Sequence, residues 1–140
     1  MNSTNATIWI IDCEQWPRAC LRAELIERGY DAVGFVRLGR VTPSIRSGRR
    51  KWPAVIFLDL RGQSVKENDL ELLASTGIPL VLLSGPARLY HALVHNLKTA
   101  VILKRPITLG KIADVLEEIV SRQPGADRGL GAGAGNTDRN

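Results

Sequence analysis

The sequence predicts an α/β fold, a (βα)5 doubly wound domain built on a five-stranded parallel sheet. Five short apolar runs alternate with segments long enough to form crossover helices, which is the pattern of repeated βα units. Several of the runs are apolar at every position rather than at every second one. Continuous apolar runs are typical of strands that are buried on both faces of a parallel sheet.

The five predicted strands are rich in Ile, Val and Leu. Connections between parallel strands are right-handed, so helices are expected on both faces of the sheet. The strands are residues 7–11 (TIWII), 32–36 (AVGFV), 54–58 (AVIFL), 79–83 (PLVLL) and 100–103 (AVIL).

Two of the predicted helices are recognised by the residues at their ends. Residues 17–28 have Pro17 in the first turn and Gly29 just beyond the last, which is favourable punctuation for a helix. Residues 66–76 end before Gly77 in the same way. Both segments are therefore predicted to be crossover helices.

The remaining helical segments differ in how clearly they are marked. The last helix is the clearest, because it follows Thr108, a suitable N-cap, and repeats apolar residues at i, i+3, i+4 and i+7 as far as Arg122. Residues 87–98 carry leucines along one face. Residues 39–51 show no clear apolar stripe among their Pro, Gly and Arg residues.

The composition is that of one soluble globular domain. The chain has 140 residues, of which 44% are hydrophobic and 24% are charged. No apolar run approaches the ~20 residues of a membrane helix, and the first residues lack the features of a signal peptide, so we expect a cytoplasmic protein with reduced cysteines. We expect residues 1–122 to form the domain and Gly-rich residues 123–140 to form a flexible tail.

The tryptophans are expected to be core or partly buried packing residues. They are Trp9, Trp16 and Trp52. Trp9 lies inside the first predicted strand, and the other two flank predicted elements.

Positive charge is concentrated in one segment. The chain has a formal net charge of +5, and the segment from residue 37 to residue 51 contains no acidic residue. One interpretation is a solvated face, and the other is a patch that binds an anion or a partner. The basic residues of the segment are Arg37, Arg40, Arg46, Arg49, Arg50 and Lys51.

Polar and charged side chains follow the ends of four predicted strands. In a doubly wound sheet the functional crevice lies outside the carboxyl ends of the strands, so these side chains should meet at one edge. The sequence therefore predicts a site made of acids, a hydroxyl group and cations. The residues are Asp12, Cys13 and Glu14 after the first strand, then Asp59, Ser84, Lys104 and Arg105.

In order and spacing these pieces resemble the receiver domain of two-component response regulators, the CheY-like fold. The matching stretches are IIDCE, VIFLDLRG, IPLVLLSG and VILKRPI, with LIERGYDAVGF for the first helix and second strand, and they cover about residues 6–122. The resemblance implies the strand order 2-1-3-4-5. It also implies a single-domain signalling protein of a phosphorelay, which acts through protein–protein contacts and is not an enzyme that turns over a substrate.

The resemblance implies a phosphoryl site. Asp59 would accept the phosphoryl group from a histidine kinase or phosphotransfer protein, because a carboxylate can form an acyl phosphate. Ser84 would donate a hydrogen bond to that group, and Arg105 or Lys104 would pair with its charge. Ile102 takes the position of the family's aromatic switch residue.

The resemblance also implies a cation. Mg²⁺ prefers oxygen ligands, and here Asp12, Asp59 and the main-chain carbonyl of Arg61 would supply them, with Glu14 as a further candidate. The peptide bond before Pro106 is expected to be cis, as it is in this family.

Four features depart from the family's pattern. Cys13 replaces the second carboxylate of the first strand end, and a thiol is a poor ligand for hard Mg²⁺. Arg105 takes the place of the family's lysine, and Lys104 is displaced by one residue, which puts it on the opposite side of an extended strand. Ile102 is aliphatic, and the loop after Asp59 lacks the usual Met-Pro. A packed thiol is the preferred interpretation of Cys13.

Three functions stay open. The first is a receiver phosphorylated on Asp59, with an atypical Mg²⁺ site and a downstream protein target. The second is a pseudo-receiver, an interaction or dimerisation module that works without phosphorylation. The third is a basic nucleic-acid-binding protein, which ranks last because the chain lacks interleaved aromatic residues and a helix-turn-helix. For Asp12, Asp59 and Ser84 a purely structural role is the alternative.

Overall fold

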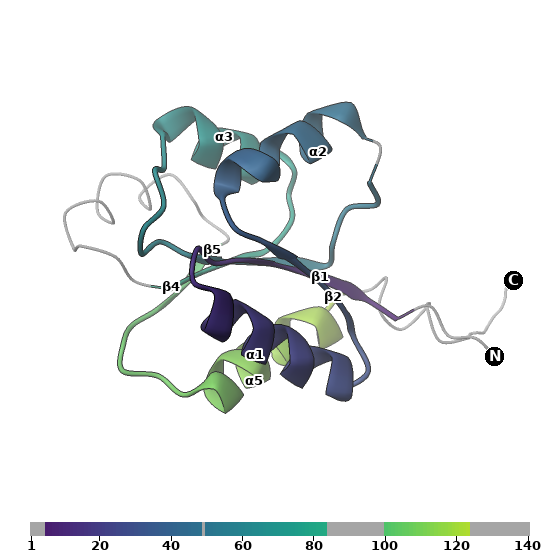
Figure 1. The fold of residues 1–140 in the computed structure, drawn as a ribbon. Helices are drawn as coiled ribbons and strands as arrows, with labels where there is room; N and C mark the ends of the chain where they lie inside the picture. Colours follow the sequence, from purple (N-terminus) through teal and green to yellow (C-terminus); the bar gives the residue numbers. More distant parts are fainter. Residues whose placement is uncertain (1–4, 49, 84–99, 124–140) are drawn as a thin grey trace, which may run out of the picture.

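A parallel sheet lies between two layers of helices (Figure 1). The computed structural model describes residues 5–48, 50–83 and 100–123. Within this part of the chain the strand order is β2-β1-β3-β4-β5 and all pairs are parallel, so the predicted fold class and strand order are confirmed. Each strand begins and ends within one residue of its prediction. The strands are β1 (Thr7–Ile11), β2 (Asp31–Phe35), β3 (Val55–Asp59), β4 (Leu80–Leu83) and β5 (Ala100–Leu103).

The helices cover both faces of the sheet. Figure 1 shows α1 and α5 on one face and α2 and α3 on the other. The predicted helix at 87–98 and the predicted tail beyond residue 123 lie outside the described residues. The described helices are α1 (Gln15–Glu27), the short 3₁₀ helix η1 (Leu38–Arg40), α2 (Thr42–Ser47), α3 (Glu67–Ser75) and α5 (Leu109–Ser121).

The ends of the helices follow the predicted punctuation. Gly29 and Gly77 come just after the caps of α1 and α3 and have φ angles of +97° and +75°, which is the left-handed conformation that glycine adopts most easily. The Thr108 hydroxyl accepts a hydrogen bond from the main-chain N–H of Lys111 at 3.2 Å. Thr108 is therefore the N-cap of α5, as predicted.

The segment around residues 39–51, in which the sequence shows no clear apolar stripe, forms η1 and α2. Leu38, Val41 and Ile45 are buried against the sheet, and this short stripe was hidden by the Pro and Arg residues between its members. Gly48, with φ of +65°, ends α2.

Alternation along the strands divides the core in two. In β1, Trp9 and Ile11 face η1, α2 and α3, whereas Ile8 and Ile10 face α1 and α5. Neighbouring strands repeat this division because successive side chains point to opposite faces of a sheet. The carboxyl ends of the strands are consequently fixed by packing on both faces of the sheet.

The expectation for the tryptophans is correct for Trp9 and wrong for Trp16. Trp9 is fully buried, but Trp16 is 78% exposed and Trp52 is 45% exposed. Trp16 lies in the first turn of α1, and the buried face of that helix is made by Leu21 and Leu25. Five and nine residues separate these leucines from Trp16, so at 100° per residue Trp16 lies off the buried face.

In the part of the chain that the structure describes, no helix has both the length and the apolar character needed to cross a bilayer.

Candidate functional site

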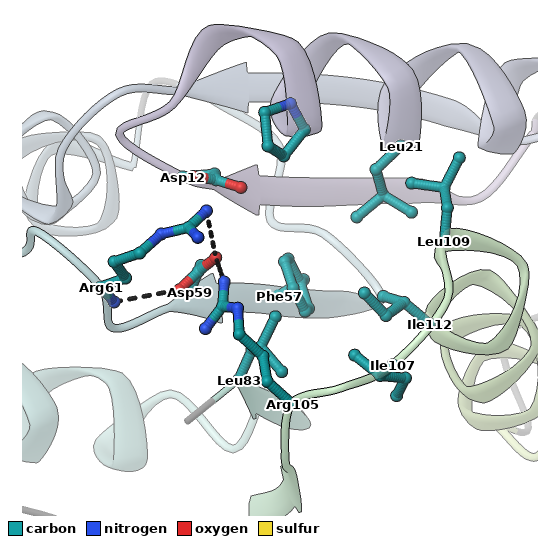
Figure 2. A pocket seen from close by; sticks show the side chains of 11 residues that line it. Asp12, Leu21, Phe57, Asp59, Arg61, Leu83, Arg105, Ile107, Leu109 and Ile112 are labelled. Carbon is teal, nitrogen blue, oxygen red and sulfur yellow. Dashed lines mark hydrogen bonds and ion pairs between the residues drawn. The ribbon is translucent and has the colours of Figure 1, made fainter. Parts of the chain in front are cut away.

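The carboxyl ends of β1, β3 and β5 bring four predicted site residues together. Asp12 follows β1, Asp59 is the last residue of β3, Arg61 lies in the next loop, and Arg105 follows β5 (Figure 2). The carboxylates are almost fully buried, with Asp12 2% and Asp59 1% exposed. The sequence prediction that these residues share one edge of the sheet therefore agrees with the structure.

These residues line one side of a pocket with a volume of about 330 Å³. Its other side is apolar and reaches between α1 and α5 (Figure 2). The apolar lining comes from Leu21, Phe57, Leu83, Ile107, Leu109 and Ile112.

Both oxygens of the Asp59 carboxylate have partners. Oδ1 accepts a hydrogen bond from the main-chain N–H of Arg61 at 3.0 Å. Oδ2 forms an ion pair with Nη2 of Arg105, and Nη2 of Arg61 lies 3.6 Å from the same oxygen. Two guanidinium groups thus compensate one buried carboxylate, which satisfies the requirement that a buried charge be paired.

Asp12 lies in a less compensated environment. Its Oδ1 accepts the main-chain N–H of Glu14 at 2.9 Å, and its main-chain carbonyl accepts Nη1 of Arg18 at 2.8 Å. Burial raises the pKa of Asp12 above its usual value, and the negative charge of Asp59 raises it further. The hydrogen bond from Glu14 and the charge of Arg61 oppose that rise in pKa without cancelling it.

The thiol of Cys13 is packed against the loop that follows Asp59. Its Sγ donates a hydrogen bond to the main-chain carbonyl of Arg61 at 3.2 Å. Gly62 has φ of +74°, and a Cβ atom on it would lie 2.5 Å from that sulfur. The thiol therefore fills the space between β1 and this loop, in agreement with the preferred interpretation of Cys13.

The side chain of Arg61 lies among the expected metal ligands. Its Nη2 is 3.3 Å from Oε1 of Glu14 and 3.6 Å from Oδ2 of Asp59. A guanidinium group thus already bridges two carboxylates that were candidate ligands, while the carbonyl of Arg61 accepts the thiol of Cys13. Mg²⁺ prefers oxygen ligands and a thiol is a soft one, so Asp12, Asp59 and the Arg61 carbonyl are the expected oxygen ligands left around Cys13, and a cation would have to compete with two guanidinium groups for Asp59.

Three further predicted features lie on or just after β5. Lys104 is exposed, and in the described residues the ion pairs of Asp59 come from Arg61 and Arg105 rather than from Lys104. The Arg105–Pro106 peptide bond is cis. Ile102 of β5 is 38% exposed.

Two predicted residues lie outside the described residues. They are Ser84, the expected phosphoryl contact, and Arg49 of the basic segment.

Sequence reasoning missed the side chain of Arg61. Only its main-chain carbonyl was considered as a ligand, yet its guanidinium group contacts both Asp59 and Glu14. The signal was present in the stretch DLRG, because a glycine in a left-handed conformation just after Arg61 turns the loop back on the strand end.

Comparison with known proteins identifies the fold. No protein-family model and no curated protein matches the chain. A response regulator receiver protein from Sinorhizobium medicae superimposes with a TM-score of 0.69 at 15% identity, over 84% of this chain and 96% of that chain.

Two further structures give the same result. A CheY-like response regulator receiver domain protein from Methanospirillum hungatei has a TM-score of 0.70 at 16% identity, over 87% of this chain and 98% of that one. The signal receiver domain of a Luxo repressor protein from Vibrio parahaemolyticus has a TM-score of 0.68 at 15% identity, over 92% and 100% of the two chains. At such identities the likeness concerns the fold, which is that of a receiver domain.

Proposed function

We propose that this chain is a signalling module with a receiver fold, which acts through protein–protein contacts and does not depend on Mg²⁺-assisted phosphorylation of Asp59. The observation that carries the proposal is the pairing of the Asp59 carboxylate with Arg105 and Arg61. Its partners would be a downstream protein or a second copy of the chain. The activity is binding rather than turnover of a substrate.

The chemistry of phosphoryl transfer supports this proposal. Transfer to a carboxylate needs a free nucleophilic oxygen and a cation that neutralises the incoming charge. In this site Oδ1 of Asp59 accepts a main-chain N–H and Oδ2 is paired with two guanidinium groups. The thiol of Cys13 replaces a carboxylate and caps the carbonyl of Arg61. The nucleophile is consequently engaged, and a hard divalent cation would have to displace guanidinium groups from Asp59 and do without the second carboxylate that Cys13 replaces.

One observation favours phosphorylation as a second candidate function. Asp59 borders an open pocket, and guanidinium groups pair well with phosphoryl oxygens. In this candidate function a histidine kinase or phosphotransfer protein would supply the phosphoryl group, and Arg105 would pair with it. Arg61 would have to leave Asp59 during the transfer.

Acetyl phosphate separates the two candidate functions. The protein is incubated with acetyl phosphate and Mg²⁺, and its intact mass is measured beside that of an Asp59→Asn control. We expect no phosphoryl adduct on the unmodified protein. A single adduct that disappears in Asp59→Asn would overturn the proposal in favour of phosphorylation.

A triple variant tests the stated cause. Cys13→Asp combined with Arg105→Lys restores the residue types of the family pattern, and Arg61→Gln removes the competing guanidinium group. We expect an adduct in the triple variant, with circular dichroism showing that each protein is folded. If the triple variant also stays unmodified, the side chains at these three positions are not the reason for the lack of transfer.

A further inference from the structure

The segment between β2 and β3 presents a basic surface, made of Arg37, Arg40, Arg46, Arg50 and Lys51. We propose that this basic surface is the docking site for an acidic, partly apolar stretch of a partner protein. The inference rests on the proposed function, because it names the surface and the class of partner through which such a module would act.

The sequence segment that carries this surface holds the net positive charge of the whole chain. The net charge of the chain is +5, whereas the six basic residues between positions 37 and 51 contribute +6 without any acidic residue. The rest of the chain therefore has a net charge of −1. Such separation produces a local field that steers an oppositely charged partner to one face.

The basic side chains are displayed on a fixed backbone. Leu38 and Val41 are at most 1% exposed and anchor η1 in the core. Arg37 and Arg40 lie beside these anchors and are exposed. Arg46 follows the buried residue Ile45 in the same way in α2. Alternation of buried anchors and exposed arginines sets the spacing of the charges.

Three further contacts hold the two ends of the segment. The side chain of Gln63 accepts the main-chain N–H of Leu38 at 3.0 Å and donates to the carbonyl of Val36 at 2.9 Å. The guanidinium group of Arg50 lies over the ring of Phe35, 5.6 Å from its centroid. A surface that is ordered before binding loses less entropy when a partner docks.

The arginines of the basic surface are available to carboxylates. In the described residues the arginines with ion pairs are Arg28, Arg61, Arg105 and Arg122, and none of these belongs to the basic surface. An arginine can bind a carboxylate through two parallel hydrogen bonds, which gives orientation as well as affinity.

Exposed apolar side chains flank the charges. Val36 is 43% exposed and Trp52 is 45% exposed, one at each end of the segment. Tryptophan and arginine are the residue types that contribute most to protein–protein interfaces. The partner stretch should therefore combine acidic with apolar residues.

The same features argue against a nucleic acid as the partner. Binding of single strands uses several aromatic side chains on which successive bases stack. In the described part of this surface Trp52 is the exposed aromatic residue, and the ring of Phe35 is covered by Arg50. α2 has six residues, which is short for a helix that must read the major groove.

Fluorescence anisotropy tests the proposal with two labelled probes. The first is a peptide that alternates Glu-Glu with Leu, and the second is a single-stranded oligonucleotide of equal charge. The basic surface is altered by Arg40→Glu with Arg46→Glu. The matched control is Lys111→Glu with Arg122→Glu, which changes the net charge equally on α5, and circular dichroism checks each fold.

We expect the peptide to bind more tightly than the oligonucleotide, with an affinity that falls as salt rises. Arg40→Glu with Arg46→Glu should weaken peptide binding about tenfold or more, and the α5 control about twofold or less. Equal losses in both variants would mean that net charge alone attracts the peptide. Absence of peptide binding, or tighter binding of the oligonucleotide, would also overturn the proposal. The mass measurement on Asp59 is independent of this surface, so either proposal can fail alone.

Discussion

Gly62 faces the thiol of Cys13 across the edge of the sheet. The turn after Asp59 places Gly62 in a left-handed conformation, and the sulfur occupies the space where a Cβ atom would be. An asparagine or aspartate could tolerate the φ angle but not this contact. The identity of residue 62 is thus set by its backbone conformation and by the thiol together.

Alanine at Gly62 should cost more than alanine at an open left-handed position. Gly77 has nearly the same φ, with nothing within 4 Å of the added Cβ, so Gly77→Ala should lower the free energy of unfolding by about 1–2 kcal/mol. Gly62→Ala should lower it further, because it adds the clash with Sγ. Cys13→Ala in the Gly62→Ala background should remove that excess. Urea denaturation measures the unmodified protein, these three variants and Cys13→Ala alone, and equal costs at both glycines would disprove the contact.

Asp12 should make stability depend on pH. Its pKa in the folded protein is raised above the usual 3.8, mainly by burial, so the folded state binds the proton more tightly than the unfolded state. The free energy of unfolding therefore falls as pH rises from 3.8 through the folded pKa.

Asp12→Asn should accordingly stabilise the protein at pH 7. The amide keeps an oxygen for the main-chain N–H of Glu14 but has no charge to bury. We expect a higher melting temperature at pH 7 for the variant and a smaller difference from the unmodified protein below pH 3.8. Thermal denaturation at the two pH values measures this, and a variant that is less stable at pH 7 would contradict it.

At the scale of elements, the sequence predicted what depends on local patterns. The apolar runs located every described strand, and Gly29, Gly77 and Thr108 located three helix ends. Burial of Trp16 was predicted wrongly, because its position on α1 depends on which face the leucines of that helix turn to the sheet.

The site was predictable from the sequence only where it depends on the topology of the sheet. Strand ends placed Asp12, Asp59 and Arg105 at one edge, because in a parallel sheet that edge follows from topology. The bridging position of the Arg61 guanidinium group depends on a turn conformation and on the direction of a long side chain. The glycine of the stretch DLRG signals the turn, but no short-range pattern of the sequence encodes the direction of the side chain.

Charged and phenolic groups join α1 to α5. Arg28 forms ion pairs with Glu24 of α1 and with Asp114 and Glu117 of α5. The hydroxyl of Tyr30 donates to Oε2 of Glu117 at 3.0 Å. Burial, together with this hydrogen bond, raises the pKa of Tyr30 to about 12.

This raised pKa predicts an alkaline transition. Tyr30 ionises at about pH 10 in the unfolded chain and at about 12 in the folded one, so the free energy of unfolding should fall as pH rises from 10 to 12. Absorbance titration of the phenol should show a late step that is missing in Tyr30→Phe. The variant identifies the step, because the chain also contains Tyr90. A single step near pH 10 in the unmodified protein would contradict the pairing with Glu117.

At the scale of the whole molecule, one sheet separates two cores and supports the site. The core under α1 and α5 includes Phe57 and Leu83, which also line the pocket beside Asp59. The core under α2 and α3 anchors the basic surface through Leu38, Val41 and Ile45. The pocket beside Asp59 and the basic surface thus rest on opposite faces of the same sheet.

A shared sheet should make the two cores unfold together. Leu25 packs on one face and Leu73 on the other, and both are at most 2% exposed, so Leu25→Ala and Leu73→Ala should each lower the free energy of unfolding by about 2–5 kcal/mol. Ile26→Ala, at a position that is 46% exposed, is the control and should cost far less. Tryptophan fluorescence and circular dichroism should give coincident transitions in every variant. Separate transitions would contradict this prediction, because one core would then unfold while the other persists. β1 and β3 contribute side chains to both cores and would not couple them.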